Sequence, residues 1–194
     1  MKEFVFFSNN KNKIFEINNL FLHSPVKILN LNNFKKIKSP NETGLTFKEN
    51  AKIKSLYGYK KLKKICFADD SGISVSSLNG EPGVNSKKFL NQNSNPKKNL
   101  EKIISISNNM NKFEAVFQTT ICLSINENKN IFFTGQVFGK ISQSIKGVKG
   151  FGYDPIFIPN GHNLTFAEMN IKQKNLISHR AIAINKLKNY LVSI

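Results

Sequence analysis

The chain has 194 residues and an apolar share of 40 %, which allows one domain with a substantial core. Lysine and arginine number 29 against 12 acidic residues, so the formal net charge is +17. No stretch approaches the roughly 20 apolar residues of a membrane helix, which excludes a membrane-spanning protein. The apolar run at residues 4–7 is too short for a secretory signal. Cys66 and Cys122 lie in apolar stretches, which predicts buried free thiols and a cytoplasmic protein.

The large positive charge suggests an anionic partner. Lysine and asparagine are abundant in almost every part of the chain, however. This dispersion indicates a solvated basic surface, and we expect no nucleic-acid partner. A small substrate that carries phosphate groups would also be attracted, so charge alone does not decide the function.

The N-terminal segment has the order strand, polar loop and helix. Lys2–Phe7 is predicted as a strand, and the polar residues Ser8–Lys13 follow it. Apolar residues at helical spacing predict a helix that begins near Asn12 or Lys13. Backbone N–H groups and the helix dipole favour an anion at such a helix start, so this segment could hold a phosphate group. Many α/β proteins have this turn without that use.

A second helix is predicted over Phe47–Lys61, after a short strand over Val26–Leu31. Thr46 and Glu49 have the spacing of a capping box, which gives Glu49 a structural role. Glu42 lies in the preceding loop without such an explanation, so it is the freer carboxylate.

The apolar run Ile65–Ala68 predicts a buried strand that ends at Asp69 and Asp70, where serine and glycine indicate a turn. Successive strand side chains point to opposite sides, so one carboxylate can face a site while the other supports the turn. Mg²⁺ takes one or two protein carboxylates plus substrate phosphates, which Glu42 and Asp70 could supply. A remaining carboxylate could orient or deprotonate a water. The alternative is a solvated strand end without a ligand.

The rest of the chain predicts further helices and strands. They are a helix over Pro96–Ile106, an antiparallel hairpin of Phe113–Ile125 and Ile131–Ile145, a strand over Ile156–Ile158, and a last helix over His179–Val192.

The glycine-containing segment Gly150–Pro155 has residues suited to a ring-shaped ligand. Its glycines allow close approach of the backbone, and Phe151 and Tyr153 offer flat faces on which a ring could stack. A glycine turn that leads into a core strand would explain the same residues.

Two cations stand at the predicted start of the last helix. Ser178 is placed as an N-cap, and His179 and Arg180 follow at the end of the helix that disfavours positive charge. A ligand with acceptor atoms would offset this cost, and Lys174 could point the same way. A solvated surface helix end is the alternative.

Together these segments describe a nucleotide site, and the chain resembles the inosine triphosphate pyrophosphatase family from end to end. The matching motifs are SNNKNK at 8–13, ETGLTFKENA at 42–51, ADDSG at 68–72, GEPGVNS at 80–86, GFGYDPIF at 150–157 and ISHR at 177–180. The resemblance implies Mg²⁺-dependent hydrolysis of ITP, dITP and XTP to the nucleoside monophosphate and pyrophosphate. It also implies a homodimer.

The resemblance also implies residue roles. Asp70 matches the general base and a metal contact, Glu42 matches a metal-binding carboxylate, and Asp69 lies in the same acidic centre. The implied substrate contacts are Ser8, Asn9, Asn10, Lys11, Asn12, Lys13, Ser71, Phe151, Gly152, Tyr153, Asp154, Lys174, His179 and Arg180.

A pocket of this kind can select its base. Inosine and xanthosine carry a 6-oxo group, which donors from His179 or Arg180 would bind while opposing the 6-amino group of adenine. Guanine also has a 6-oxo group, and the sequence does not show how it is rejected.

The chain departs from its relatives at several positions. Asn9 and Asn12 stand where glycine is frequent, and asparagine tolerates a left-handed conformation. Lys88, in the run 87–89, stands near an arginine of relatives, and a lysine lacks the planar guanidinium. Val116 falls where arginine is common.

We expect an α/β fold with a long mixed twisted sheet, flanking helices, and two lobes with the active-site cleft between them, formed by one domain over residues 1–194. Two alternatives stay open. A noncatalytic nucleic-acid-binding protein would use the basic charge but gives no reason for Glu42, Asp69 and Asp70 to converge. An enzyme of the same scaffold could act on other nucleotides, such as modified pyrimidines.

Overall fold

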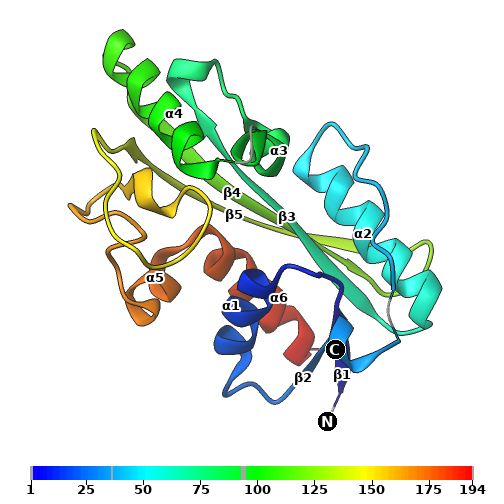
Figure 1. Ribbon diagram of the computed structural model, residues 1–194. Coiled ribbons are helices and arrows are strands. Elements are labelled where there is room, and N and C mark those ends of the chain that lie inside the picture. The colour runs from blue at the N-terminus through cyan, green and yellow to red at the C-terminus, as the bar shows by residue number, and fades with distance from the viewer. Residues whose placement is uncertain (1, 36, 93–94, 194) are drawn as a thin grey trace. The chain divides into compact units, whose positions relative to one another are not determined.

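The computed structural model describes residues 2–35, 37–92 and 95–193. They form one six-stranded sheet in the order β2-β1-β3-β4-β5-β6, together with six α-helices (Figure 1). The mixed sheet and its helices confirm the predicted α/β class. The chain divides into two compact units: residues 1–70, 119–135 and 180–194 form unit 1, and residues 71–118 and 136–179 form unit 2.

The strands and helices follow the predicted order. The strands are β1 (Glu3–Phe6), β2 (Lys27–Asn30), β3 (Cys66–Val75), β4 (Glu114–Ser124), β5 (Asn130–Ile141) and β6 (Phe157–Pro159). The helices are α1 (Lys11–Phe21), α2 (Phe47–Leu62), α3 (Ser86–Leu90), α4 (Pro96–Met110), α5 (Ile171–Ile177) and α6 (His179–Ser193).

The sheet is mixed because its two ends pair differently. β1 lies parallel to both β2 and β3, whereas β5 and β6 are antiparallel. β4 and β5 form the predicted hairpin: Gln136 donates to Gln118, and the hydroxyls of Thr120 and Thr134 are 3.1 Å apart. Residue numbers in these pairs run in opposite directions, which is the antiparallel pattern.

Unit 1 has helices on both faces of its strands. Phe4, Phe6 and Phe67 pack with α1 and α6 in one apolar cluster, and Figure 1 shows these two helices side by side. Phe7 and Ala68 lie in a separate cluster with residues of α2. This division follows from the period of two along a strand, which sends neighbouring side chains to opposite faces.

Unit 2 has its own aromatic core. Phe117 of β4 packs there with Ile103 of α4 and with Phe157 and Phe166, all of them buried. Several contacts between the rings are edge-on or tilted, which is the usual geometry of packed aromatic side chains. Strand β4, helix α4 and strand β6 therefore contribute to one core.

Several expectations about elements need correction. β3 does not end at Asp69 and Asp70 but continues to Val75, so serine and glycine stand inside a strand rather than a turn. α4 extends to Met110, four residues beyond the prediction. β5 ends at Ile141, four residues before the predicted end. α3 and α5 have no predicted counterpart, and Lys174 lies on α5.

Other local expectations are confirmed. Thr46 and Glu49 form the capping box of α2, and α6 begins at His179. Both cysteines are buried free thiols. None of the helices in the described part of the chain is long and apolar enough to cross a membrane.

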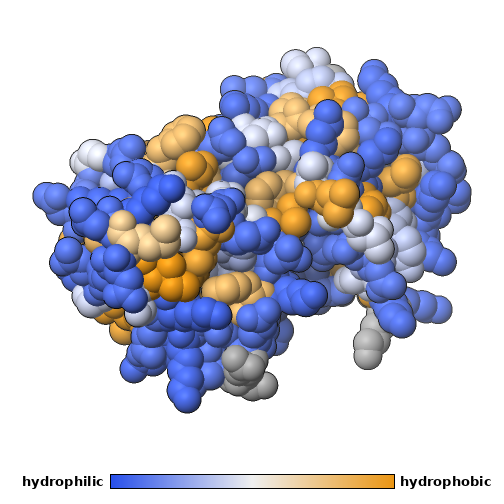
Figure 2. All heavy atoms as spheres, turned by 90° about the horizontal axis from the view of Figure 1, so that it is seen from above, coloured by the Kyte–Doolittle hydropathy of each residue, from blue (hydrophilic) through white to orange (hydrophobic). Residues whose placement is uncertain are grey.

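The surface agrees with the interpretation that the positive charge is spread over solvated side chains. Hydrophilic side chains cover most of the face seen in Figure 2, with smaller apolar areas between them. Exposed salt bridges among the described residues include Lys60 with Glu127 and Lys97 with Glu101, and such pairs add little stability.

The packing of α2 on β1 gives a first prediction. A Cβ at Gly58 would lie 2.6 Å from a ring carbon of Phe7. Glycine to alanine in an exposed helix stabilises by up to about 1 kcal/mol, but overpacking a core costs about 1–3 kcal/mol. Gly58→Ala should therefore lower the free energy of unfolding by about 1 kcal/mol, measured by urea titration. Gly58→Ala should cost less when it is added to Phe7→Leu than when it is added to the wild type, because leucine leaves room for the new methyl group. A Gly58→Ala variant more stable than the wild type would contradict the packing.

Candidate active site

The adjacent acids of β3 lie in unit 1 on opposite faces of the strand. Phe67 packs toward α1 and α6, and two residues later Asp69 points the same way. Ala68 packs toward α2, and Asp70 follows it to that side. Both carboxylates are buried, with exposed fractions of 2 % and 7 %. Buried charges at these positions require cationic partners on each face.

On one face, Asp69 is held by two cations. Lys13 of α1 lies 3.0 Å from its Oδ2, and Nε of Arg180, on α6, donates to the same oxygen at 3.3 Å. Arg180 also pairs through its terminal nitrogen with the buried Glu16 of α1. Burial lowers the pKa of Lys13, and the charge of Asp69 opposes this. Burial also acts on Arg180, but Glu16 and Asp69 raise its pKa overall.

On the other face, α2 supplies the partners of Asp70. Nζ of Lys54 lies 2.7 Å from Oδ1 of Asp70 and 2.9 Å from Oε2 of Glu42. Nδ2 of Asn50 donates to Oδ2 of Asp70 at 3.4 Å. Burial raises the pKa of Asp70 to about 6, although the Lys54 charge opposes the increase. Burial alone would raise the pKa of Glu42 too, but Lys54 lowers it overall.

Asn50 joins the loop of Glu42 to Asp70. Its Oδ1 accepts from the backbone N–H of Gly44 at 2.8 Å, which leaves its NH₂ group to donate to Asp70. Glu49 accepts from the N–H groups of Leu45 and Thr46 and fixes the same loop. Helix α2 therefore positions both the loop that carries Glu42 and the part of β3 that carries Asp70.

The predicted phosphate segment starts α1 one or two residues earlier than expected. Asn10 is its N-cap, and Oδ1 of Asn10 accepts from the N–H groups of Asn12 and Lys13. Asn9 donates to Oγ of Ser39, and Lys11 is exposed. Among the described residues other than glycine, positive φ angles occur at positions 63, 79 and 111, so Asn9 and Asn12 need no left-handed conformation.

Unit 2 contains a second buried cluster around Lys174 of α5. Its Nζ lies 2.7 Å from Oδ2 of Asp154 and within 6 Å of the ring centres of Phe151 and Phe166. The backbone N–H of Phe151 donates to the same Asp154 oxygen at 2.7 Å. One carboxylate thus fixes both the lysine and the aromatic loop.

Four other predicted contacts also lie in unit 2. Tyr153 is buried and its hydroxyl donates to the backbone oxygen of Ser86 at 2.6 Å, so the flat face that we expected it to offer is inside the core. His179 is also buried, and its ring stacks on Phe117. Gly152 has a φ of 69° in the same loop, and Ser71 follows Asp70 along β3.

The structure brings some of the predicted residues together and separates others. Glu42 and Asp70 share Lys54, whereas Asp69 faces Lys13 and Arg180. Within the described residues, no three acidic, histidine or cysteine side chains form one metal cluster. The role of Asp69 as a metal ligand stays a prediction.

Sequence reasoning missed Glu16, Asn50 and Lys54. Asn50 and Lys54 are four residues apart on a helix that was predicted, so their common face could be expected. Glu16 lies one turn after Lys13 on α1, but its ion pair with Arg180 is a long-range contact that no local pattern predicts.

Comparison with known proteins decides the family. Residues 4–190 match the model of the Ham1 family. The chain belongs to the Ham1 family. A protein of Christiangramia forsetii named dITP/XTP pyrophosphatase is 41 % identical over 187 residues, which cover 96 % of this chain and 97 % of that protein. A Staphylococcus aureus protein of that name is 38 % identical over 98 % of this chain and 97 % of its own length.

Solved Ham1 structures have the same fold. A Ham1 protein from Coxiella burnetii matches with a TM-score of 0.90 and 33 % identity, and all of both chains is covered. The Staphylococcus aureus Ham1 protein matches with a TM-score of 0.87 and 37 % identity over 99 % of both chains. The resemblance to the inosine triphosphate pyrophosphatases is thus confirmed at the level of the family.

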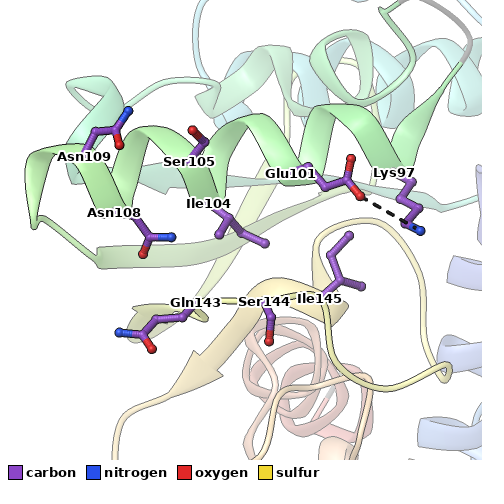
Figure 3. Close-up of a pocket in the computed structure, with 9 residues that line it drawn as sticks. All are labelled: Lys97, Glu101, Ile104, Ser105, Asn108, Asn109, Gln143, Ser144 and Ile145. Atoms are coloured by element: carbon purple, nitrogen blue, oxygen red, sulfur yellow. Dashed lines mark ion pairs between the residues drawn. The ribbon is translucent and has the colours of Figure 1, made fainter.

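This Ham1 family member also has a surface groove in unit 2. Figure 3 shows it in unit 2, between α4 and residues 143–145, with a volume of about 400 Å³. Ile104 and Ile145 are its apolar lining, and amide and hydroxyl groups such as those of Asn108 and Ser105 form the rest. No residue predicted to bind substrate or metal lines it.

The pKa of Asp70 predicts how stability depends on pH. Because its folded pKa is about 6 and its unfolded pKa about 3.9, the folded protein binds more protons than the unfolded chain between those values. Stability therefore falls as the pH rises through this window. Asp70→Asn removes this titration but also loses the ion pair with Lys54. The melting temperature of the variant minus that of the wild type should therefore rise from pH 4 to pH 6 and then level off, whatever the constant cost of the lost pair. We would measure it by thermal unfolding without divalent ions; a difference that shrinks with rising pH would contradict the assignment.

The contact of Glu16 with Arg180 predicts a large loss of stability. Glu16→Gln removes the carboxylate that pairs with the buried guanidinium of Arg180, and breaking a buried ion pair costs about 3 kcal/mol or more. The matched control, Glu101→Gln, breaks an exposed pair and should change the free energy of unfolding by about 0.5 kcal/mol or less. Equal losses in urea titrations of the two variants would show that the Glu16 pair is not structurally important.

Proposed function

We propose that this protein hydrolyses noncanonical purine nucleoside triphosphates, ITP, dITP and XTP, to the nucleoside monophosphate and pyrophosphate. The observation that carries the proposal is Asp70, a buried carboxylate with a raised pKa that α2 orients through both of its oxygens. Relatives that match nearly the whole chain are named dITP/XTP pyrophosphatase. The activity makes the chain a hydrolase of phosphoric anhydride bonds.

Asp70 is suited to be the general base. A pKa near 6 leaves the carboxylate ionised at neutral pH but more basic than an ordinary aspartate. It would accept a proton from a water whose oxygen attacks the α-phosphorus. The bond from that phosphorus to the oxygen bridging it to the β-phosphorus then breaks, and pyrophosphate leaves. Lys54 and Asn50 hold the carboxylate oxygens in place for this step.

Glu42 and Asp70 fit the requirements of Mg²⁺. Both are carboxylates, and one ammonium group lies within 3 Å of an oxygen of each, so they converge on a position that suits a cation. A bound Mg²⁺ would supply charge neutralisation for the phosphate oxygens. Glu42 and Asp70 would hold it, and Asp69 would support Lys13 from the other face of the strand.

The start of α1 would bind the triphosphate. Its first N–H groups and Lys13 are positive groups at one helix end, and Asp69 holds the lysine in place. Ser8, Asn9, Asn10, Lys11 and Asn12 are the other predicted contacts in this segment. Lys54 is an additional cation for phosphate oxygens.

The cluster of unit 2 would recognise the purine base. Phe151 supplies an aromatic face, and Lys174 and His179 supply donors that suit a 6-oxo group and oppose a 6-amino group. Asp154 fixes the lysine and the loop, and Arg180 follows His179 in the chain. We propose that both units serve one reaction as a single pyrophosphatase domain.

Two further assignments rest on the resemblance. We propose that the protein works as a homodimer in the cytoplasm, where the nucleotide pool is used. Light scattering of the purified protein would show the mass of the assembly, and a monomer at micromolar concentration would reject the dimer.

A substrate panel tests the proposed function. With Mg²⁺, the wild type should release pyrophosphate from ITP, dITP and XTP much faster than from ATP and GTP, whereas Asp70→Asn should lose at least about 1,000-fold of kcat. The variant should keep its circular dichroism spectrum and its cooperative melting. Equal rates with all five nucleotides, or release from none of the first three, would reject the proposal. Salt-sensitive binding of a polynucleotide without hydrolysis would favour a nucleic-acid-binding protein instead.

A further inference from the structure

The ring of His179 stacks on Phe117 and also meets Phe166 at a tilt, with the ring centres of His179 and Phe166 6.4 Å apart. Its centre lies 4.4 Å from that of Phe117, and the two ring planes are only 3° apart. His179 and Phe117 belong to unit 2, and both are buried, with exposed fractions of 3 % and 6 %. One whole face of the imidazole is therefore covered.

Phe117 is itself fixed by its neighbours. The ring of Phe157 meets it edge-on at 4.8 Å, and Tyr153 meets it edge-on at 6.4 Å. Tyr153 is anchored by its hydrogen bond to Ser86, and Phe166 packs on Phe117 at a tilt. A side chain enclosed in this way has one accessible rotamer.

The stack determines where His179 can donate a hydrogen bond. The nitrogens of an imidazole donate and accept in the plane of the ring, and a hydrogen bond weakens steeply away from a straight line. Turning the imidazole about its last side-chain bond would break the parallel contact with Phe117. The plane of the stack therefore sets the plane of the donor.

We propose that Phe117 is a specificity-determining positioning residue, which holds the imidazole of His179 in the plane that distinguishes a 6-oxo from a 6-amino purine. The inference rests on the proposed function, because it assigns His179 to the base. Phe117 acts through His179 and needs no contact with the nucleotide. Its effect is on the choice of base rather than on the cleavage step.

The test compares two leucine variants of the same core. Phe117→Leu removes the flat face under His179, whereas Phe157→Leu makes the same change at a fully buried neighbour and leaves the flat face of Phe117 in place. The measured quantity is the ratio of kcat/KM for ITP to kcat/KM for ATP, with Mg²⁺. Phe117→Leu should lower the ratio about 10-fold, mainly by raising KM for ITP, and Phe157→Leu should keep it within about 3-fold. Phe117→Tyr retains the flat ring and should retain the ratio.

A spectroscopic measurement keeps the inference testable if the leucine variants do not fold. In the wild type, the ring of Phe117 should shift the carbon-bound imidazole protons of His179 upfield, and the His179→Gln spectrum assigns them among the three histidines. Phe117→Met, which is a flexible apolar side chain without a ring, should remove the upfield shift. Wild-type resonances at ordinary positions would overturn the stack and the inference.

The outcomes separate this inference from the proposed function. If the wild type prefers ITP and Phe117→Leu keeps that preference, the inference fails while the pyrophosphatase assignment stands. If both leucine variants lose the preference equally, the effect is general loosening of the core and the inference is again wrong. If the wild type hydrolyses neither nucleotide, the proposed function fails and this inference fails with it.

Discussion

Two adjacent carboxylates in the middle of a buried strand are the constraint on which the site depends. The period of two along β3 sends Asp69 and Asp70 to opposite faces, so they cannot share one set of partners. Each face therefore needs its own cations, because an isolated buried carboxylate is too costly. Lys13 and Arg180 meet this need on one face, and Lys54 meets it on the other. The helices that pack on unit 1 are the same ones that carry these side chains.

This arrangement gives the two acids different chemistry. Asp69 is bound by two cations and fixes their positions. Asp70 is bound by one lysine and one amide and has a raised pKa, which suits a proton acceptor. The local sequence leaves open which aspartate is the general base. The different partners of the two residues give a physical reason to propose Asp70. A carboxylate that organises charge and a carboxylate that accepts a proton need different surroundings.

The sequence predicts what depends on local patterns and misses what depends on distant contacts. The capping box at Thr46 and the start of α6 at His179 are set by near neighbours, and the structure confirms both. Serine and glycine after Asp70 were interpreted as a turn, but strand pairing keeps them extended as far as Val75. The partnership of Glu16 with Arg180 joins residues 164 positions apart, and no local pattern signals it. Motif recognition names candidate site residues, but it could not give their faces or partners.

Burial divides the charges of the chain into two groups, those paired in the interior and those on the surface. Against 29 basic residues there are 12 acids, and four of those acids are buried. They are Glu16, Asp69, Asp70 and Asp154. Each pairs with a lysine or arginine in one of the two clusters. The excess of lysine is therefore a property of the surface, where it attracts anions without selecting among them. Selectivity requires desolvated and oriented groups, and in this chain the buried acids mark where those groups lie.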